Sequence, residues 1–115
     1  MGYKSDVYLV MDKEDYEKIQ HFNIFKYASK IRDFKLPDEP DNYTLIIWEY
    51  INWYNEENDI KELRNYLIKN FTGSYDYLCL GEYYDDTTIE DYLGILNFTR
   101  FTKVYLKNLN IDDIP

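Results

Sequence analysis

Acidic and phenolic side chains alternate in one short segment of the chain, residues 81–92. Its acids, Glu82, Asp85 and Asp86 among them, offer carboxylate oxygens, which bind either a hard cation or a basic protein surface. They lack the Asp-x-Asp-x-Asp-Gly spacing of a calcium-binding EF-hand loop. A chain with 22 acids also supplies carboxylate pairs by chance. We therefore expect no metal site here and favour contact with a basic partner.

A second segment of similar composition lies upstream, where Trp53 and Tyr54 precede Glu56 and Glu57. Tyr and Trp are enriched at protein interfaces, although in a small domain they also fill the core and half-exposed sheet positions. Trp48 stands inside an apolar run and is expected in the core, whereas Trp53 is the expected interface hot spot. The aromatic residues expected to be exposed as anchors are Tyr50, Trp53, Tyr54, Tyr83, Tyr84 and Tyr92. The predicted partner-binding residues are Trp53, Tyr54, Glu56, Glu57, Glu82, Tyr83, Tyr84, Asp85, Asp86, Glu90 and Asp91.

The charge of the chain is strongly negative and unevenly distributed. The formal net charge is -9. The first 35 residues hold seven Lys or Arg and six acids, whereas the remaining residues hold six and sixteen. Phosphate contacts need clustered Lys and Arg, so direct binding to nucleic acid or to an anionic membrane is disfavoured. A basic protein partner is favoured, and solvation of a charged surface is the alternative explanation for the same acids.

Few residues of the chain could support catalysis. His21 is the only histidine, and no nucleophile accompanies it in the sequence. Cys79 is the single cysteine and lies in an apolar stretch, so we expect a buried thiol and a reducing compartment. The four glycines provide neither a P-loop nor a dinucleotide-binding fingerprint. We therefore expect a non-enzymatic protein with no cofactor and no metal.

The elements that would position these residues follow from local patterns. We expect a strand over 5–11, with both faces covered, and then a helix that starts at Lys13 with Asp12 as its N-cap. The apolar stripe of this helix drifts near residue 20, so 13–32 forms either one bent helix or two short ones. Residues 36–42 read as a loop because two prolines lie among turn formers. A strong strand follows over 43–54.

The second half of the chain continues the alternation of expected helices and strands. Asn58 or Asp59 should cap a helix that runs to about Asn70, with an apolar face at 60, 63, 67 and 71. Strands are expected over 75–84 and 101–106, and 89–93 forms either a hairpin partner or a short helix. The tail after residue 110 should be frayed. These elements predict a single α+β domain, residues 1–115. Its mixed or antiparallel sheet would have four to five strands, with two helices packed on one face, in the order β-α-β-α-β-(β)-β.

Three motifs, taken together, carry a family resemblance. The chain opens with Met-Gly-Tyr-Lys-Ser-Asp-Val, continues with Trp-Glu-Tyr-Ile-Asn-Trp-Tyr from Trp48, and then has Gly-Glu-Tyr-Tyr-Asp-Asp from Gly81. It resembles a family of short bacteriophage and prophage proteins that typically begin Met-Gly-Tyr-Arg-Ser-Asp-Val, with Lys4 in place of the arginine. None of these motifs is a catalytic signature, so no functional residue is carried over. The resemblance implies a phage-encoded accessory protein in the cytoplasm of a bacterial host.

The leading functional hypothesis is a protein that sequesters or inhibits a basic, nucleic-acid-handling host or defence protein. By analogy with other small acidic phage proteins, CRISPR and restriction systems are the expected targets, and the acidic surface would imitate nucleic acid. One alternative is an assembly protein that forms a homo-oligomer. Another is a sponge for a small signalling nucleotide, whose pocket would use Lys4, Lys26, Lys30 and Arg32. A metal-dependent hydrolase using Glu82, Asp85, Asp86 or Glu90 is a further alternative.

Overall fold

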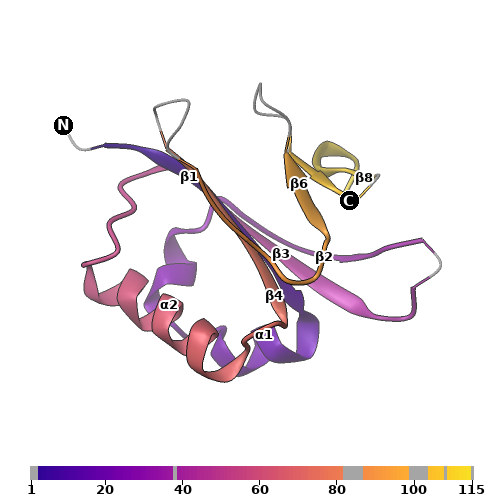
Figure 1. Ribbon diagram of the computed structural model, residues 1–115, viewed down its shortest axis with the longest axis horizontal. Helices are drawn as coiled ribbons and strands as arrows, with labels where there is room; N and C mark the ends of the chain where they lie inside the picture. The colour runs from indigo at the N-terminus through magenta and orange to yellow at the C-terminus, as the bar shows by residue number, and fades with distance from the viewer. Residues whose placement is uncertain (1–2, 38, 82–86, 99–103, 108, 115) are drawn as a thin grey trace.

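A computed structural model describes residues 3–37, 39–81, 87–98, 104–107 and 109–114 of the 115-residue chain. Its centre is a five-stranded antiparallel sheet with the strand order β2-β3-β1-β4-β5. The strands of this sheet are β1 (Ser5–Asp12), β2 (Lys30–Lys35), β3 (Asn42–Ile51), β4 (Tyr75–Gly81) and β5 (Thr87–Asp91). Figure 1 shows the helices on one side of this sheet and a smaller sheet on the other. The predicted α+β class is confirmed.

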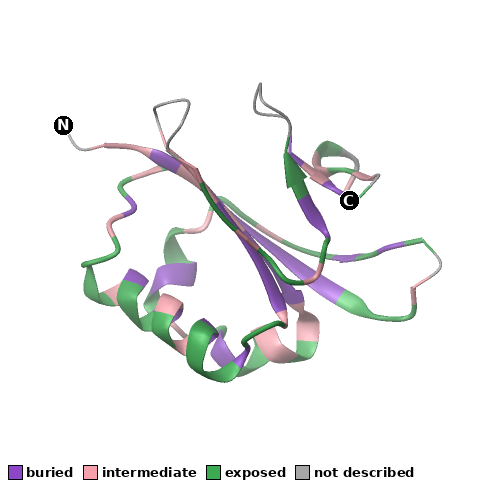
Figure 2. Cartoon of the chain, in the orientation of Figure 1, coloured by how far each residue is buried: buried purple, intermediate pink, exposed green. Residues whose placement is uncertain are grey.

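The helices cover one face of the large sheet because every second side chain of its strands points to that face and is mostly apolar. Val7, Leu9 and Met11 of β1 point toward α1 (Lys13–Ile19), a 3-10 helix η1 (Asn23–Tyr27) and α2 (Asn58–Asn70). The apolar stripe of α2, which includes Leu63 and Leu67, is fully buried against them. The strands under the helices are the most continuously buried part of the chain (Figure 2). No helix in the described part of the chain is long and apolar enough to cross a membrane.

The opposite face of the large sheet carries a second core beneath a small antiparallel sheet of order β6-β7-β8. This sheet consists of β6 (Leu96–Phe98), β7 (Val104–Leu106) and β8 (Leu109–Asn110), and a 3-10 helix η2 (Ile111–Asp113) follows it. Val10 and Leu78 of the large sheet pack against Leu96 and Leu106 of the small one. Both faces of β1 are therefore covered, as its sequence predicts.

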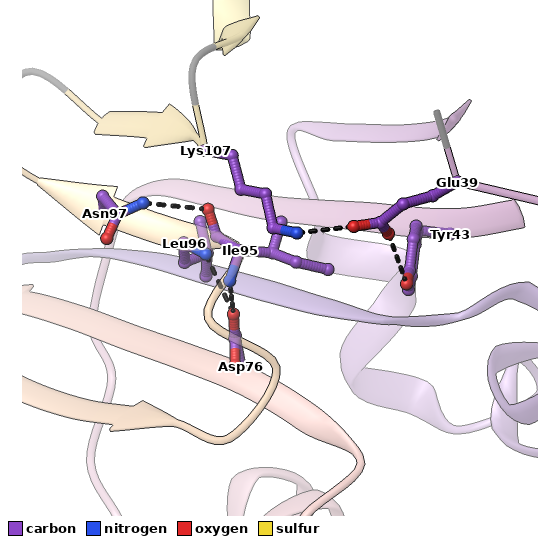
Figure 3. A network of polar contacts seen from close by, with 7 residues as sticks. All are labelled: Glu39, Tyr43, Asp76, Ile95, Leu96, Asn97 and Lys107. Carbon is purple, nitrogen blue, oxygen red and sulfur yellow. Dashed lines mark hydrogen bonds and ion pairs between the residues drawn. The ribbon is translucent and has the colours of Figure 1, made fainter. Parts of the chain in front are cut away.

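A buried carboxylate accepts hydrogen bonds from the turn between the two sheets. Asp76 of β4 is fully buried, and its Oδ2 accepts hydrogen bonds from the backbone N–H groups of Ile95 and Leu96 at 2.7 and 2.9 Å. Its Oδ1 accepts a third, from the backbone N–H of Leu93. Figure 3 shows the Asp76 carboxylate pointing at the chain that enters β6, with Lys107 reaching Glu39 nearby.

Several boundaries differ from the sequence-based expectation, and the order β-α-β-α-β-(β)-β is wrong. The expected helical region over 13–32 contains two short helices, α1 and the 3-10 helix η1, so that alternative holds as far as Tyr27. Its last residues are not helical: β2 takes them because they pair with β3 in a hairpin, Lys30 opposite Ile47. The β-hairpin alternative holds for Ile89, which lies in β5 opposite Leu78. The N-cap of α2 is Glu57, and its side chain makes no capping hydrogen bond.

The C-terminal region also departs from expectation. β6 was not predicted, and β7 (Val104–Leu106) lies within the strand expected over 101–106, of which residues 101–103 lie outside the described residues. The tail is not frayed over its described residues, because Leu109, Ile111 and Ile114 pack against the second core. Burial of these apolar side chains stabilises the ordered tail by more than the backbone entropy that ordering it costs.

Candidate functional site

The register of the large sheet brings the ends of β3 and β4 to one end of the sheet. Ser5, at the start of β1, pairs with Ile51 at the end of β3 and with Gly81 at the end of β4. Because β1 lies between these strands, Ile51, which precedes residues 52–57, and Gly81, the last described residue of β4, lie on either side of its first residue. We call this the β1-start end of the sheet. Segments far apart in sequence are thus neighbours through backbone pairing alone.

The predicted partner-binding residues have different environments. Glu56, Glu57 and Asp91 are exposed, and Tyr54 is half-buried, with its hydroxyl accepting the backbone N–H of Tyr3 at 2.8 Å. Trp53 and Glu90 face inward. The remaining five, Glu82, Tyr83, Tyr84, Asp85 and Asp86, lie outside the described residues.

Trp53 is not an exposed anchor, which corrects the sequence-based expectation. Its side chain is 7% exposed, and its ring centroid lies 4.8 Å from that of Trp48, which is in the core as predicted. The Trp53 Nε1–H donates to the Tyr77 hydroxyl at 2.8 Å. After Ile51 the chain leaves β3, and the Trp53 indole packs into the core on the helix-covered face of the sheet. Burying its large apolar surface there is more favourable than leaving it in contact with water. Trp53 therefore anchors the loop instead of contacting solvent.

Of the aromatic residues expected to be exposed, Tyr50 lies at the β1-start end, whereas Tyr92 follows Asp91 toward the opposite end of the sheet. Tyr50 is 73% exposed and Tyr92 is 49% exposed, as the sequence predicts. Tyr50 occupies the left-handed region at φ 51°, and its N–H donates to Asp6 Oδ1 at 2.7 Å. The Lys4 ammonium lies 5.5 Å from the centre of the Tyr50 ring, within cation–π range. Tyr50 is thus held in place while its ring stays accessible.

Acids from three elements surround one phenol beside this end. Burial, together with the nearby charges of Asp6, Glu49 and Asp112, raises the pKa of Tyr8 to about 12. These acids come from β1, β3 and η2. The negative potential is therefore built from the tertiary structure and does not reflect one run of acids.

Glu90 belongs to an internal ion pair. Its Oε1 receives a hydrogen bond from Arg64 Nη1 at 2.5 Å and another from the Tyr75 hydroxyl at 2.9 Å. Burial acts to raise the pKa of Glu90, but these two hydrogen bonds and the Arg64 charge outweigh it and hold the pKa below its usual value. The Arg64 guanidinium also lies over the Tyr77 ring, 3.9 Å from its centre.

A pocket of about 160 Å³ opens beside this ion pair, on the helix-covered side of the β1-start end. Arg64 of α2 and Tyr77 of β4 line it together with Thr88 of β5. Burial raises the pKa of the Tyr77 phenol, with the neighbouring Cys79 as a second cause, so the phenol is neutral at physiological pH. Tyr3, Ser5, Trp53 and Asn55 add further polar and aromatic groups to the lining.

The remaining candidates from the sequence do not assemble into a catalytic or metal centre in the described part of the chain. His21 is exposed, and its ring meets Phe22 edge-on at 5.0 Å. Cys79 is half-buried and lines the pocket. No group of three or more His, Cys, Asp or Glu side chains among the described residues could hold a metal ion. Lys4, Lys26, Lys30 and Arg32 do not line the pocket described above.

Sequence reasoning did not single out Arg64, Tyr77 or Asp76. Arg64 follows Ile60 by four residues and so shares part of the apolar face of α2, which is the signal that could have identified it. Asp76 alternates with Tyr75 and Tyr77 in an apolar strand covered on both faces, and an acid there requires internal partners.

Comparison with known proteins identifies no relatives: no protein-family model, curated protein or solved structure matches the chain.

Proposed function

We propose that this protein is a non-enzymatic binding protein that engages a basic protein partner through the β1-start end of the sheet. The observation that carries the proposal is the pairing of Ser5 with both Ile51 and Gly81. It places the ends of β3 and β4 on either side of the start of β1 and so defines the proposed surface. This surface includes the exposed residues Tyr50, Glu56 and Glu57.

Electrostatics supports a basic partner. The net charge of -9 lies mainly after residue 35, and Glu49, Glu56 and Glu57 are exposed at this end. Such a surface accelerates encounter with a positively charged protein and repels nucleic acid and anionic membranes. Exposed tyrosine beside carboxylates is also typical of interface anchors. The family resemblance points to a host or defence protein that handles nucleic acid, since such proteins present Arg and Lys grooves.

The test is capture of host proteins by the tagged protein at low and high salt, followed by affinity measurement with the captured partner. The test variant carries Glu82→Lys, Asp85→Lys and Asp86→Lys together. The control carries Glu14→Lys, Glu17→Lys and Asp41→Lys, which are exposed acids of α1 and of the residues before β3. Both variants change the net charge equally, but the control sites lie toward the opposite end of β1, where Asp12 pairs with Tyr43.

We expect a basic nucleic-acid-handling protein to be captured at low salt and released at high salt. The test variant should weaken its binding at least tenfold, and the control should weaken it much less. Equal loss in both variants would mean that net charge alone drives capture. That result, unchanged affinity in the test variant or recovery of the bait alone would each refute the proposal.

A further inference from the structure

We propose that the pocket between α2, β4, β5 and the loop after β3 binds a small planar organic monoanion of the aromatic carboxylate class. The inference is independent of the proposed protein partner. It rests on the composition of the pocket lining, the way Arg64 is held at the pocket, and the volume of the pocket.

The lining of the pocket has the opposite charge to the rest of the protein. Arg64 is its cation, and none of the described residues that line it is an acid, in a chain with 22 acids. Ser5, Asn55 and Thr88 contribute neutral polar groups that can donate hydrogen bonds. A cavity with one guanidinium and neutral donors favours an anion over a cation or a neutral molecule.

The Arg64 guanidinium is held in place before any ligand arrives. Its Nη1 is bonded to Glu90 and its plane lies over Tyr77. Tyr77 is itself fixed by the hydrogen bond from Trp53 Nε1. A guanidinium has five N–H donors, and the bond to Glu90 uses one of them, so the others can serve a carboxylate. Little side-chain entropy is lost on binding, because the side chain is already oriented.

The volume and walls of the pocket select the shape of the ligand. A dry cavity of about 150 Å³ in another protein holds one benzene molecule, and this pocket has about 160 Å³. The aromatic residues Trp53 and Tyr77 line it, and both are at least nine-tenths buried. A ring in contact with such walls gains hydrophobic and stacking energy. One ring bearing one small charged group therefore fits.

A monoanion is favoured over a dianion for electrostatic reasons. The Arg64 charge is already shared with Glu90, whose carboxylate is held ionised by that contact. The net charge of -9 adds a repulsive field that grows with the charge of the ligand. A phosphate dianion would meet twice this repulsion and would also lose a much larger hydration energy on entering the pocket, since the cost of desolvating an ion rises with the square of its charge.

The experiment is an NMR titration of the whole protein with benzoate, with benzamide and inorganic phosphate as comparison ligands. We expect saturable amide shifts at Asn55, Arg64 and Thr88, with a benzoate dissociation constant on the order of 1 mM. Benzamide, which has the same shape without the charge, should bind at least fivefold more weakly, and phosphate should bind more weakly still.

Two variants that each lower the net charge by one provide a matched comparison. Asn55→Asp places a carboxylate in the pocket at an exposed loop residue, and Lys61→Gln removes a charge from an exposed residue of α2 that does not line it. Asn55→Asp should weaken benzoate binding at least fivefold, and Lys61→Gln should leave it within twofold. Absence of saturation, equal binding of benzoate and benzamide, tighter binding of phosphate, or equal effects of the two variants would each overturn the proposal.

Discussion

Replacing Asp76 with alanine should destabilise the protein more than the same replacement of any surface acid. The reason is that the Asp76 carboxylate is buried and hydrogen-bonded between the two sheets. It is fully buried and accepts three backbone N–H groups, from Leu93, Ile95 and Leu96. Asp76→Ala would leave these three donors without their acceptor. An unsatisfied buried donor costs about 1–3 kcal/mol, and hydrogen bonds to a charged acceptor lie at the upper end of the normal range.

The expected loss is about 3 kcal/mol. We take the lower value of about 1 kcal/mol for each of the three N–H groups, because the substitution also removes the cost of burying a carboxylate. With about 4 °C of melting temperature per kcal/mol for a domain of this size, the midpoint should fall by about 12 °C. Asp76→Asn keeps one acceptor oxygen and should lose about half as much.

Urea denaturation monitored by circular dichroism gives the free energy of unfolding, and a thermal scan gives the midpoint. The control is Asp91→Ala, since Asp91 lies opposite Asp76 in the β4–β5 pairing but is exposed. It should change the free energy of unfolding by no more than about 0.5 kcal/mol. A loss below about 1 kcal/mol for Asp76→Ala, or equal losses for the two variants, would refute the reasoning.

Two further predictions concern Trp53, which lines the pocket, and Glu90, which forms the ion pair with Arg64 beside it. Trp53→Phe removes the indole N–H that reaches the Tyr77 hydroxyl and should lower the free energy of unfolding by about 1–2 kcal/mol in urea, whereas an exposed hot spot would show no loss. Glu90 has a pKa held below its ordinary 4.5 in the folded protein, so its contribution to stability is present at neutral pH and is lost as the pH falls from 4.5 through the folded-state value. Wild type and Glu90→Gln should therefore differ in stability at neutral pH and converge in acid, and a gap that does not depend on pH would contradict the role of the Arg64 ion pair.

Local patterns in the sequence are sufficient for much of the scaffold. The alternation through β1 predicts a strand covered on both faces, and Asp12 predicts the start of α1, where its side chain accepts the N–H of Glu14 at 2.8 Å. The apolar stripe of α2 predicts its buried face. Each of these features depends on residues within one or two turns, and local sequence reports them directly.

Competition between local preference and distant pairing explains the errors. Ile31 continues the helical spacing of Ile24 and Ala28, but each residue from Lys30 to Lys35 pairs with a residue of β3, and they form β2 instead. Trp53 follows a strand that becomes polar, and its burial depends on Trp48 and Tyr77, which neighbour it only in the folded chain. Tertiary context overrides propensity in both cases.

Composition and pattern by themselves determined that this chain is an α+β protein with its negative charge concentrated after residue 35, because such properties are sums over local residues. Only the tertiary structure decided which residues meet. It joined Arg64 to Glu90 across 26 positions, brought the ends of β3 and β4 to either side of the start of β1, and placed a cation in a pocket without an acid among its described lining residues. These contacts depend on strand order and register, which are fixed by the packing of the whole chain and leave no signature in any one segment.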